Sequence, residues 1–424
     1  MELKPGYKET DVGVIPDDWE ILKISDITKE ISMGPFGSDI KVSNFVKEGV
    51  PVLSGKNVQK EKLDDEFHNF VTPEKARSLK KAVAKRGDIV VTHRGTIGQI
   101  SYIPNYSRYE KYVISQSQFR LHIDQQKSTP EWVVHYFHSD SGSRRLLEKK
   151  GHTGVPAIAQ ATTTFRSLFL PVPPIPEQRA IATALSDVDA LLDGLDRLIA
   201  KKRDLKQAAM QQLLTGETRL PVFEGDWEVK RLGELFEITS SKRVFQSEWK
   251  YEGIPFYRAR ELAVLGETGR VENELFISKS LYAAFKTAHG VPEPGDMLVT
   301  GVGTLGKVYV VKDDNEFYFK DGNIIWFKIH GSVSSEFLRQ LFLTKVVMKQ
   351  ITDAAAGTTV GTYTISGAKK TEIPFPSLPE QTAIATVLSD MDAEITALEQ
   401  RRNKTKELKQ AMMQELLTGK TRLI

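Results

Sequence analysis

A long internal repeat is the feature that most limits how this chain can fold. Residues 171–220 return at 374–423 with a constant offset of 203, and 26 of the 44 positions from Glu177 to Leu220 are identical in the second copy. Each copy opens with PxPxxPEQ and closes with LLTGxTRL. A fainter repeat at offset 208 links Asp18-Trp19-Glu20 to Asp226-Trp227-Glu228. The chain is therefore two similar halves in tandem, and a protein built twice usually meets something that is itself two-fold.

The bulk composition excludes several classes of protein. A length of 424 residues predicts two to four domains. No apolar run approaches the ~20 residues of a membrane span, and the N-terminus lacks an apolar signal core. The absence of cysteine excludes disulfides, thiolate catalysis and cysteine-ligated zinc, and it favours a cytoplasmic protein. A net charge of +3 means that any nucleic-acid site must be a local patch.

The repeated segments have the pattern of long helices. Pro176 and Pro379 suit a first helical turn, and Gly216 and Gly419 suit a helix C-terminus. Each helix should run for about 38 residues, or roughly 57 Å. Apolar residues spaced alternately by four and three indicate a coiled coil, which we expect to be antiparallel. The predicted pairing positions are Ile181, Leu185, Val188, Leu192 and Leu195 in one helix and Ile384, Leu388, Met391, Ile395 and Leu398 in the other. The first pattern continues to Ile199, where the second has Arg402.

The variable parts combine strand and helix patterns in matching order. Trp19 and Trp227 each open a strand pattern, Asp88 and Asp296 each follow a glycine and start an apolar strand, and helical spacing returns near 131–149 and 335–351. We therefore predict two α/β (α+β) domains separated by the coiled coil, in a pseudo-two-fold dumbbell. The predicted boundaries are 1–172 and 217–375 for the domains, and 173–216 and 376–424 for the helices.

Two motifs resemble sites that the chain lacks. Gly301-x-Gly303-x-x-Gly306 matches a dinucleotide fingerprint, but a strand pattern follows it where the fingerprint needs a helix, so we expect a hairpin loop. Glu131, His135 and His138 share a helical face, but no further histidines complete a metal site, so we expect a histidine pair on a helix surface. The sequence predicts neither a catalytic site nor a bound metal.

Polar and basic loops recur at matching places in the two halves, with different side chains. Arginine and lysine suit guanine edges, asparagine and glutamine suit adenine, and serine and threonine suit phosphates. Ordinary solvated loops are the alternative for any one residue. The candidate DNA-binding residues are Lys56, Asn57, His93, Arg94, Ser115, Gln116, Gln118, His152 and Thr153 in the first half and Arg258, Arg260, Thr300, Lys320, Asn323, Thr358 and Thr359 in the second.

These motifs closely resemble the specificity subunit of type I restriction–modification systems. The resemblance covers essentially the whole chain and includes GxIPxDWE, which here spans residues 13–20. It implies two target recognition domains, each reading one half of a split, asymmetric site in double-stranded DNA. It also implies that the helices set the spacer and dock two methyltransferase subunits, through which endonuclease-translocase subunits join.

The same resemblance implies a chain that carries no chemistry of its own. S-adenosylmethionine would belong to the methyltransferases, and ATP and Mg²⁺ to the endonuclease-translocase subunits. We expect weak DNA binding by the isolated chain, because a complex can draw many of its phosphate contacts from its partners. Two alternatives stay open. One is a coiled-coil scaffold that bridges two protein partners without reading DNA, and the other is an enzyme that acts on DNA unaided.

Overall fold

The computed structural model describes residues 5–148, 150–151, 157–158, 160–272, 275–329, 331, 333–356 and 361–423. It divides into two compact units. Unit 1 comprises residues 1–196 and 401–424, and unit 2 comprises residues 197–400. Each unit contains one globular part and a stretch of both long helices. Among the described residues, no helix is long and apolar enough to cross a membrane.

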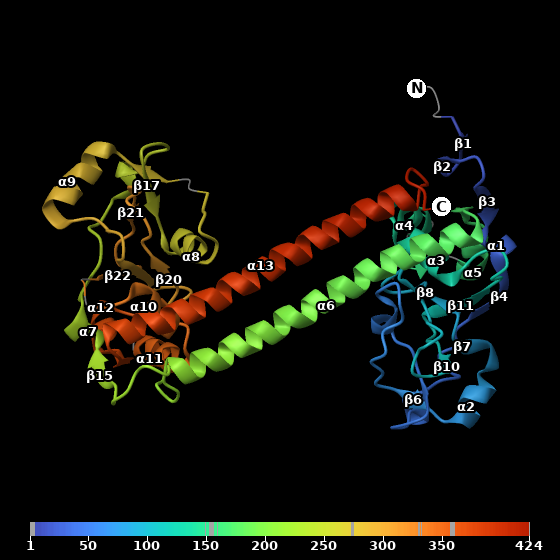
Figure 1. The fold of residues 1–424 in the computed structure, drawn as a ribbon, viewed down its shortest axis with the longest axis horizontal. Helices are drawn as coiled ribbons and strands as arrows, with labels where there is room; N and C mark the ends of the chain where they lie inside the picture. Colours follow the sequence, from blue (N-terminus) through green and yellow to red (C-terminus); the bar gives the residue numbers. More distant parts are fainter. Residues whose placement is uncertain are drawn as a thin grey trace. The chain divides into compact units, whose positions relative to one another are not determined.

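The globular part of unit 1 is built on a four-stranded antiparallel sheet with the strand order β4-β11-β8-β9. β8 (Asp88–Thr92) is buried along its whole length, as its run of apolar β-branched residues predicts. One face of the sheet packs with Trp132 and Phe137 of α3, and the other packs with Leu53 and Tyr112. Figure 1 shows α3 beside β8 within this unit.

The helices and strands of unit 1 before the long helices are β1 (Tyr7–Thr10), β2 (Gly13–Pro16), β3 (Glu20–Lys23), α1 (Ile24–Ile27), β4 (Thr28–Met33), η1 (Val42–Asn44), β5 (Val50–Pro51), η2 (Gly55–Val58), β6 (Phe70–Val71), α2 (Pro73–Ser78), η3 (Lys80–Ala82), β7 (Val83–Lys85), β8 (Asp88–Thr92), β9 (Ile100–Tyr102), β10 (Lys111–Val113), β11 (Gln118–Ile123), α3 (Pro130–His138), α4 (Asp140–Leu147), β12 (Lys150–Gly151), β13 (Ala157–Ile158), α5 (Ala161–Arg166) and β14 (Phe169–Val172).

Unit 2 repeats the same sheet with the order β16-β22-β19-β20. A smaller sheet joins β17 to β18 and, in parallel, to β21. Before α13 the elements are β15 (Glu228–Arg231), α7 (Leu232–Leu235), β16 (Glu237–Thr239), η4 (Gln246–Glu248), β17 (Ile254–Tyr257), α8 (Ala259–Thr268), β18 (Phe276–Ile277), α9 (Lys279–His289), β19 (Met297–Thr300), β20 (Val308–Val310), β21 (Tyr318–Phe319), β22 (Ile324–Lys328), α10 (Ser335–Leu341), α11 (Lys345–Ala356), α12 (Ile365–Lys370) and β23 (Glu372–Phe375).

Two sequence predictions about this fold are confirmed. Both globular parts are mixed helix and sheet on a shared scaffold, as the repeated pattern predicts. The glycine-rich segment 301–306 joins the antiparallel strands β19 and β20, so it is a hairpin loop. Gly303 and Gly306 have φ of 77° and 73°, a region that favours glycine.

The long helices are α6 (Ile175–Leu213) and α13 (Leu378–Leu416), each of 39 residues (Figure 1). Within unit 1, Asp189 pairs with Lys409 at 2.7 Å and Asp196 with Arg402 at 3.4 Å. Within unit 2, Lys202 pairs with Glu394 at 2.7 Å and Lys206 with Asp392 at 2.5 Å. In both units the residue numbers rise along one helix as they fall along the other, so the helices pair antiparallel.

All ten predicted pairing residues are buried or partly buried. Ile181, Leu185, Leu195, Ile384, Leu388 and Ile395 are buried, and Val188, Leu192, Met391 and Leu398 are partly buried. Some of them also pack on a globular part: Ile181 and Leu185 belong to the core of unit 1, and Ile384 and Leu388 to that of unit 2. The two helices differ where the first has Ile199 and the second has Arg402. Ile199 is buried, whereas the Arg402 side chain extends to Asp196.

A tryptophan, a glutamate and an arginine join the repeated motifs in each unit, and we call this set the Trp–Glu–Arg clasp. In unit 1 the Trp19 indole donates to Glu177 at 3.0 Å, and Arg422 pairs with Glu177 at 2.6 Å. In unit 2 Trp227 donates to Glu380 at 3.1 Å, and Arg219 pairs with Glu380 at 2.5 Å. Each clasp therefore uses the start of one long helix and the segment that follows the other.

The glutamine of the repeated PEQ motif is buried and hydrogen-bonded in both units. Gln178 is buried, accepts from the Ser128 hydroxyl at 3.0 Å and the Thr129 backbone N–H at 2.9 Å, and donates to the Pro173 carbonyl at 2.8 Å. Gln381 accepts from the Ser334 N–H at 2.9 Å and donates to Pro376 at 2.8 Å. The two copies of the repeat are thus similar because each holds a globular part on the long helices.

Candidate nucleic-acid interface

Four of the predicted DNA-binding residues of unit 1 line one cavity of about 390 Å³: Arg94, Ser115, Gln116 and Gln118. The topology explains the convergence, because β8 ends at Thr92 beside the start of β11 at Gln118. The loop after β8 turns through Gly95 and Gly98, with φ of 86° and 84°. Arg94 and Gln116 are exposed within this cavity, so their side chains are available to a ligand.

Two of the predicted residues are committed to internal hydrogen bonds. Asn57 is 3% exposed, and its oxygen accepts from the backbone and the hydroxyl of Ser54, both at 2.9 Å. Its nitrogen donates to the carbonyls of Asp64 and Glu66. Gln118 is fully buried and bridges Ser115 and Ser54. Both amides position the loops through these internal hydrogen bonds. Lys56, next to Asn57, is exposed.

His93 is half-buried between these loops. Its Nε2 atom is buried and has no hydrogen-bond partner among the described residues. Burial lowers the pKa of His93, and the nearby Arg94 acts in the same direction. A neutral imidazole can donate or accept one hydrogen bond at such a nitrogen, so His93 keeps a buried polar atom next to Arg94, which itself lines the cavity.

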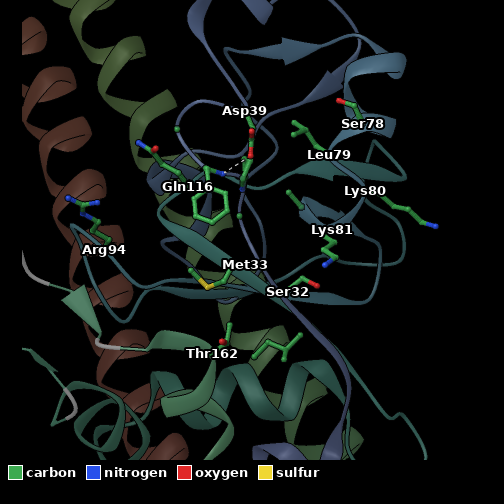
Figure 2. A pocket seen from close by; sticks show the side chains of 16 residues that line it. Ser32, Met33, Asp39, Ser78, Leu79, Lys80, Lys81, Arg94, Gln116 and Thr162 are labelled. Atoms are coloured by element: carbon green, nitrogen blue, oxygen red, sulfur yellow. Dashed lines mark hydrogen bonds between the residues drawn. The ribbon is translucent and has the colours of Figure 1, made fainter.

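A larger cavity of about 980 Å³ adjoins the first and shares Arg94 and Gln116 with it. Lys80 and Lys81 line it, and Figure 2 shows them across the pocket from Arg94 and Gln116. Sequence reasoning missed these two lysines, although the Lys80-Lys81 pair is a visible basic signal. Exposed cations on both sides of an open cavity favour a polyanionic ligand.

Unit 2 brings together the equivalent loops with different chemistry. The Lys320 N–H donates to the Tyr257 carbonyl at 2.9 Å, and the Gly301 N–H donates to Asn323 at 2.8 Å, so three loops meet. Arg258 is the N-cap residue of α8 and forms an ion pair with Glu261 at 2.6 Å. Arg260 is exposed, and Lys320 and Asn323 are partly exposed.

The remaining predicted residues divide into two groups. Thr300 is buried, and its hydroxyl donates to Thr304 and accepts from the Lys307 N–H, so it holds the hairpin loop. His152, Thr153, Thr358 and Thr359 lie outside the described residues. The DNA-binding roles of all these residues stay predictions.

A partly buried charge cluster joins the globular part of unit 1 to both long helices. Lys409 pairs with Glu61 at 2.5 Å and with Asp189 at 2.7 Å. His135 is 1% exposed, and neither of its ring nitrogens has a hydrogen-bond partner among the described residues. The expectation of a surface histidine pair is therefore wrong, because α3 turns His135 into the interface with the long helices. Burial lowers the pKa of His135 to about 4.

The same cluster has the ligand types of a metal site. Ligand atoms of Glu61, His135 and Asp189 lie within 4.8 Å of one another, which suits a cation. However, the Lys409 ammonium already contacts both carboxylates, and these contacts raise its pKa against the opposing effect of burial. Lys409 therefore takes the place of a metal ion. In unit 2, Lys206, Asp392 and Gln340 form the corresponding contacts.

Comparison with known proteins gives consistent results. The model of the type I restriction modification DNA specificity domain matches residues 16–201 and 224–410. The type I restriction enzyme MjaVIII specificity subunit of Methanocaldococcus jannaschii is 24% identical, over 98% of this chain and 96% of its own length.

Two solved structures share the fold. The S subunit of a type I restriction–modification system from M. genitalium superposes with a TM-score of 0.59 at 16% identity, and the match covers 98% of each chain. The HsdS subunit from Thermoanaerobacter tengcongensis gives a TM-score of 0.51 at 18% identity, and the match covers 96% of this chain and 98% of that subunit.

Proposed function

The chain belongs to the type I restriction–modification DNA specificity family and is a specificity subunit with two target recognition domains; from this premise we propose that each domain reads one half of a bipartite, asymmetric DNA site. The observation that carries the proposal is one scaffold with two loop chemistries. Ser54 and Arg258 are N-cap residues at equivalent places, and His93-Arg94 corresponds to Gly301-Val302. Different side chains on equivalent loops suit two different half-sites.

We further propose that the antiparallel helices set the gap between the half-sites. Each helix of 39 residues is about 58 Å long, which corresponds to roughly one and a half turns of duplex. Three or four good base contacts per domain, each contributing about 1–3 kcal/mol of discrimination, would give useful specificity.

The helices also provide surfaces for two copies of one partner. Leu205 and Leu408 occupy the same position in the repeat and are 47% and 56% exposed. Because the repeat places the same exposed side chain at matching positions of the two helices, two copies of one partner could meet similar surfaces. We propose that methyltransferase subunits bind there, that S-adenosylmethionine belongs to them, and that ATP and Mg²⁺ belong to endonuclease-translocase subunits that join through them.

The adenine methylome of cells that express this chain with and without its methyltransferase partner tests the proposal. A new two-part motif with a fixed gap, present only when both proteins are expressed, is the expected result. A stable complex that adds no methylation would instead favour a scaffold without DNA readout. Methylation by the chain alone would require a catalytic site of its own.

A replacement of residues 19–170 by the equivalent segment of another family member tests whether the domains act independently. We expect one half-site to change while the other half-site and the gap persist. A change in both half-sites would contradict independent recognition domains.

A further inference from the structure

Each unit holds a phenylalanine out from its surface. Phe36 follows β4 and is 80% exposed, and Phe245 follows β16 and is 61% exposed. Exposing a large aromatic ring to water gives up the stabilisation that its burial would contribute. Both residues lie between the first strand of the main sheet and the next strand, Phe36 shortly after β4 and Phe245 at the N-cap of η4.

The two phenylalanines sit in the same kind of turn. Phe36-Gly-Ser-Asp39 and Phe245-Gln-Ser-Glu248 have the same pattern of hydrogen bonds, although the position in unit 1 that matches Phe245 is Lys41, the N-cap residue of η1. In unit 1 the Phe36 N–H donates to the Asp39 carboxylate at 3.2 Å, and the Asp39 N–H returns to the Phe36 carbonyl at 2.9 Å. In unit 2 the equivalent distances to Glu248 are 2.7 Å and 2.9 Å. The acidic residue thus fixes the backbone and leaves the ring free, and we call this element the phenylalanine turn.

The phenylalanine turn of unit 1 is packed against a candidate DNA-binding loop. The Gly34 N–H donates to the Gln118 carbonyl at 2.8 Å. A Cβ atom at Gly34 would lie 1.9 Å from the Ser115 carbonyl oxygen, and one at Gly37 would lie 2.7 Å from Gln116 Oε1. The contact at Gly34 is to backbone, so only glycine permits it and the turn is held in place there, whereas the exposed Gln116 side chain could move away from a larger residue at position 37.

Cations line the cavity beside Phe36, and two basic residues precede Phe245 in the sequence, of which Arg243 pairs with Asp321 at 3.0 Å. Phe36 lines the larger cavity together with Lys80, Lys81 and Arg94, and Figure 2 shows these three basic side chains around the pocket. In unit 2, exposed Lys242 and Arg243 directly precede Val244 and Phe245. An apolar ring among cations matches a ligand that offers phosphates and flat base faces, which is the chemistry of DNA.

We propose that Phe36 and Phe245 each insert an aromatic ring among the bases of one half-site. This inference rests on the proposed function and deepens it, since it assigns one apolar contact to each recognition domain. Every base presents a π-face, so such a contact adds affinity and positions the DNA, while the neighbouring polar loops distinguish the bases.

The test uses the complex of the full chain with its methyltransferase subunits and a duplex that carries its methylation motif. We expect Phe36→Ala to raise the Kd roughly tenfold and Phe36→Trp to restore most of the affinity. The matched control is Tyr106→Ala. Tyr106 is 76% exposed but lies at the Asp88 end of β8, opposite to Arg94, and we expect no change in Kd.

The salt dependence of binding separates an apolar contact from an ionic one. Phe36→Ala should leave the slope of log Kd against log salt unchanged, whereas Lys80→Ala should reduce it by about one. A changed slope in Phe36→Ala, or a Kd equal to that of the wild type, would overturn the proposal. Phe245→Ala is the independent repeat in the second domain, with the same expected result.

The outcomes also distinguish the inference from the function on which it rests. If the wild type methylates its motif and the Kd values of Phe36→Ala and Phe245→Ala equal that of the wild type, only the inference about the phenylalanines is wrong. If the wild type methylates no motif, the inference and the proposed function are both wrong. If Phe36→Ala loses its methyltransferase subunits on purification while the thermal unfolding of the chain is unchanged, the ring contacts protein, and the DNA assignment is wrong.

Discussion

At the scale of single residues, His135 makes the stability of the chain depend on pH. Its pKa is lowered from an ordinary value of about 6.5 to about 4 in the folded chain. The unfolded chain therefore binds a proton more readily, so the stabilisation is complete above pH ~6.5 and is lost as the pH falls toward 4. This loss amounts to about 3 kcal/mol.

His135→Gln tests this pH dependence with a side chain that the scaffold already uses, because Gln340 occupies the equivalent place in unit 2. Between pH 7 and pH 4 we expect the free energy of unfolding to fall by about 3 kcal/mol less in the variant than in the wild type. His68→Gln is the control, since His68 is exposed. Parallel curves for His135→Gln and the wild type, from chemical denaturation at each pH, would contradict the argument.

Lys409 holds two carboxylates together, and its loss should be costly. Lys409→Met keeps the apolar stem but leaves Glu61 and Asp189 without their cation, and we expect about 3 kcal/mol less stability in urea denaturation. Lys206→Met is the matched control, because Lys206 pairs with the single carboxylate of Asp392, which is 40% exposed. It should lose about 1 kcal/mol or less. Equal losses would show that the second carboxylate contributes nothing.

Removing the ammonium should also uncover a cation site. Glu61, Asp189 and His135 then offer two carboxylates and an imidazole within 4.8 Å, a ligand set that suits Zn²⁺. We expect micromolar Zn²⁺ to raise the Tm of Lys409→Met and to leave that of the wild type unchanged. Adding His135→Gln to Lys409→Met should abolish the rise. A rise that survives this second substitution would place the ion elsewhere.

At the scale of the elements, the Trp–Glu–Arg clasp ties the end of each long helix to a domain. Glu177 is buried and takes hydrogen bonds from Trp19 and Arg422. In Glu177→Gln the Arg422 guanidinium loses its buried counter-charge but keeps the half-exposed carboxylate of Asp18, and we expect about 2 kcal/mol less stability. Hydrogen exchange should quicken in residues 417–423. Glu380→Gln should instead affect residues 214–220, and loss of protection in both segments from either variant would contradict separate clasps.

The elements also show how far the sequence could lead. The repeat predicted the long helices, the tandem domains and the positions of the motifs, because both copies carry the same geometric duty. It could not tell which amides face inward. The Asn57 side chain donates hydrogen bonds to the carbonyls of Asp64 and Glu66. No local sequence pattern predicts that this later segment covers Asn57.

His135 is a second case in which distant residues decided the outcome. Helical spacing correctly places Glu131, His135 and His138 on neighbouring positions of α3. Whether that face is wet or buried depends on Asp189 and Lys409, which lie far away in the sequence. The exposed phenylalanines are a third case, because whether Phe36 or Phe245 is covered depends on the loops around it and not on its own Phe-x-Ser-acid pattern.

At the scale of the whole molecule, each unit needs the start of one long helix and the end of the other. Unit 1 takes Glu177 from the first copy of the repeat and Arg422 from the second, whereas unit 2 takes Arg219 from the first and Glu380 from the second. Neither half of the sequence can complete its own clasp. Each domain therefore depends on both helices, so a change in helix length affects both domains.

This dependence leads to a prediction about the DNA gap. Residues 193–199 and 399–405 lie opposite one another, as the Asp196–Arg402 pair shows. Deleting both segments keeps the pairs Asp189–Lys409 and Lys206–Asp392 in register and shortens each helix by about 10 Å, or roughly three base pairs. In the methylome of cells that express the variant with its methyltransferase, we expect both half-sites unchanged and the gap about three base pairs shorter. Deleting residues 193–199 alone misaligns the pairs and should abolish methylation. If the gap is unchanged in the double deletion, the helices do not set it.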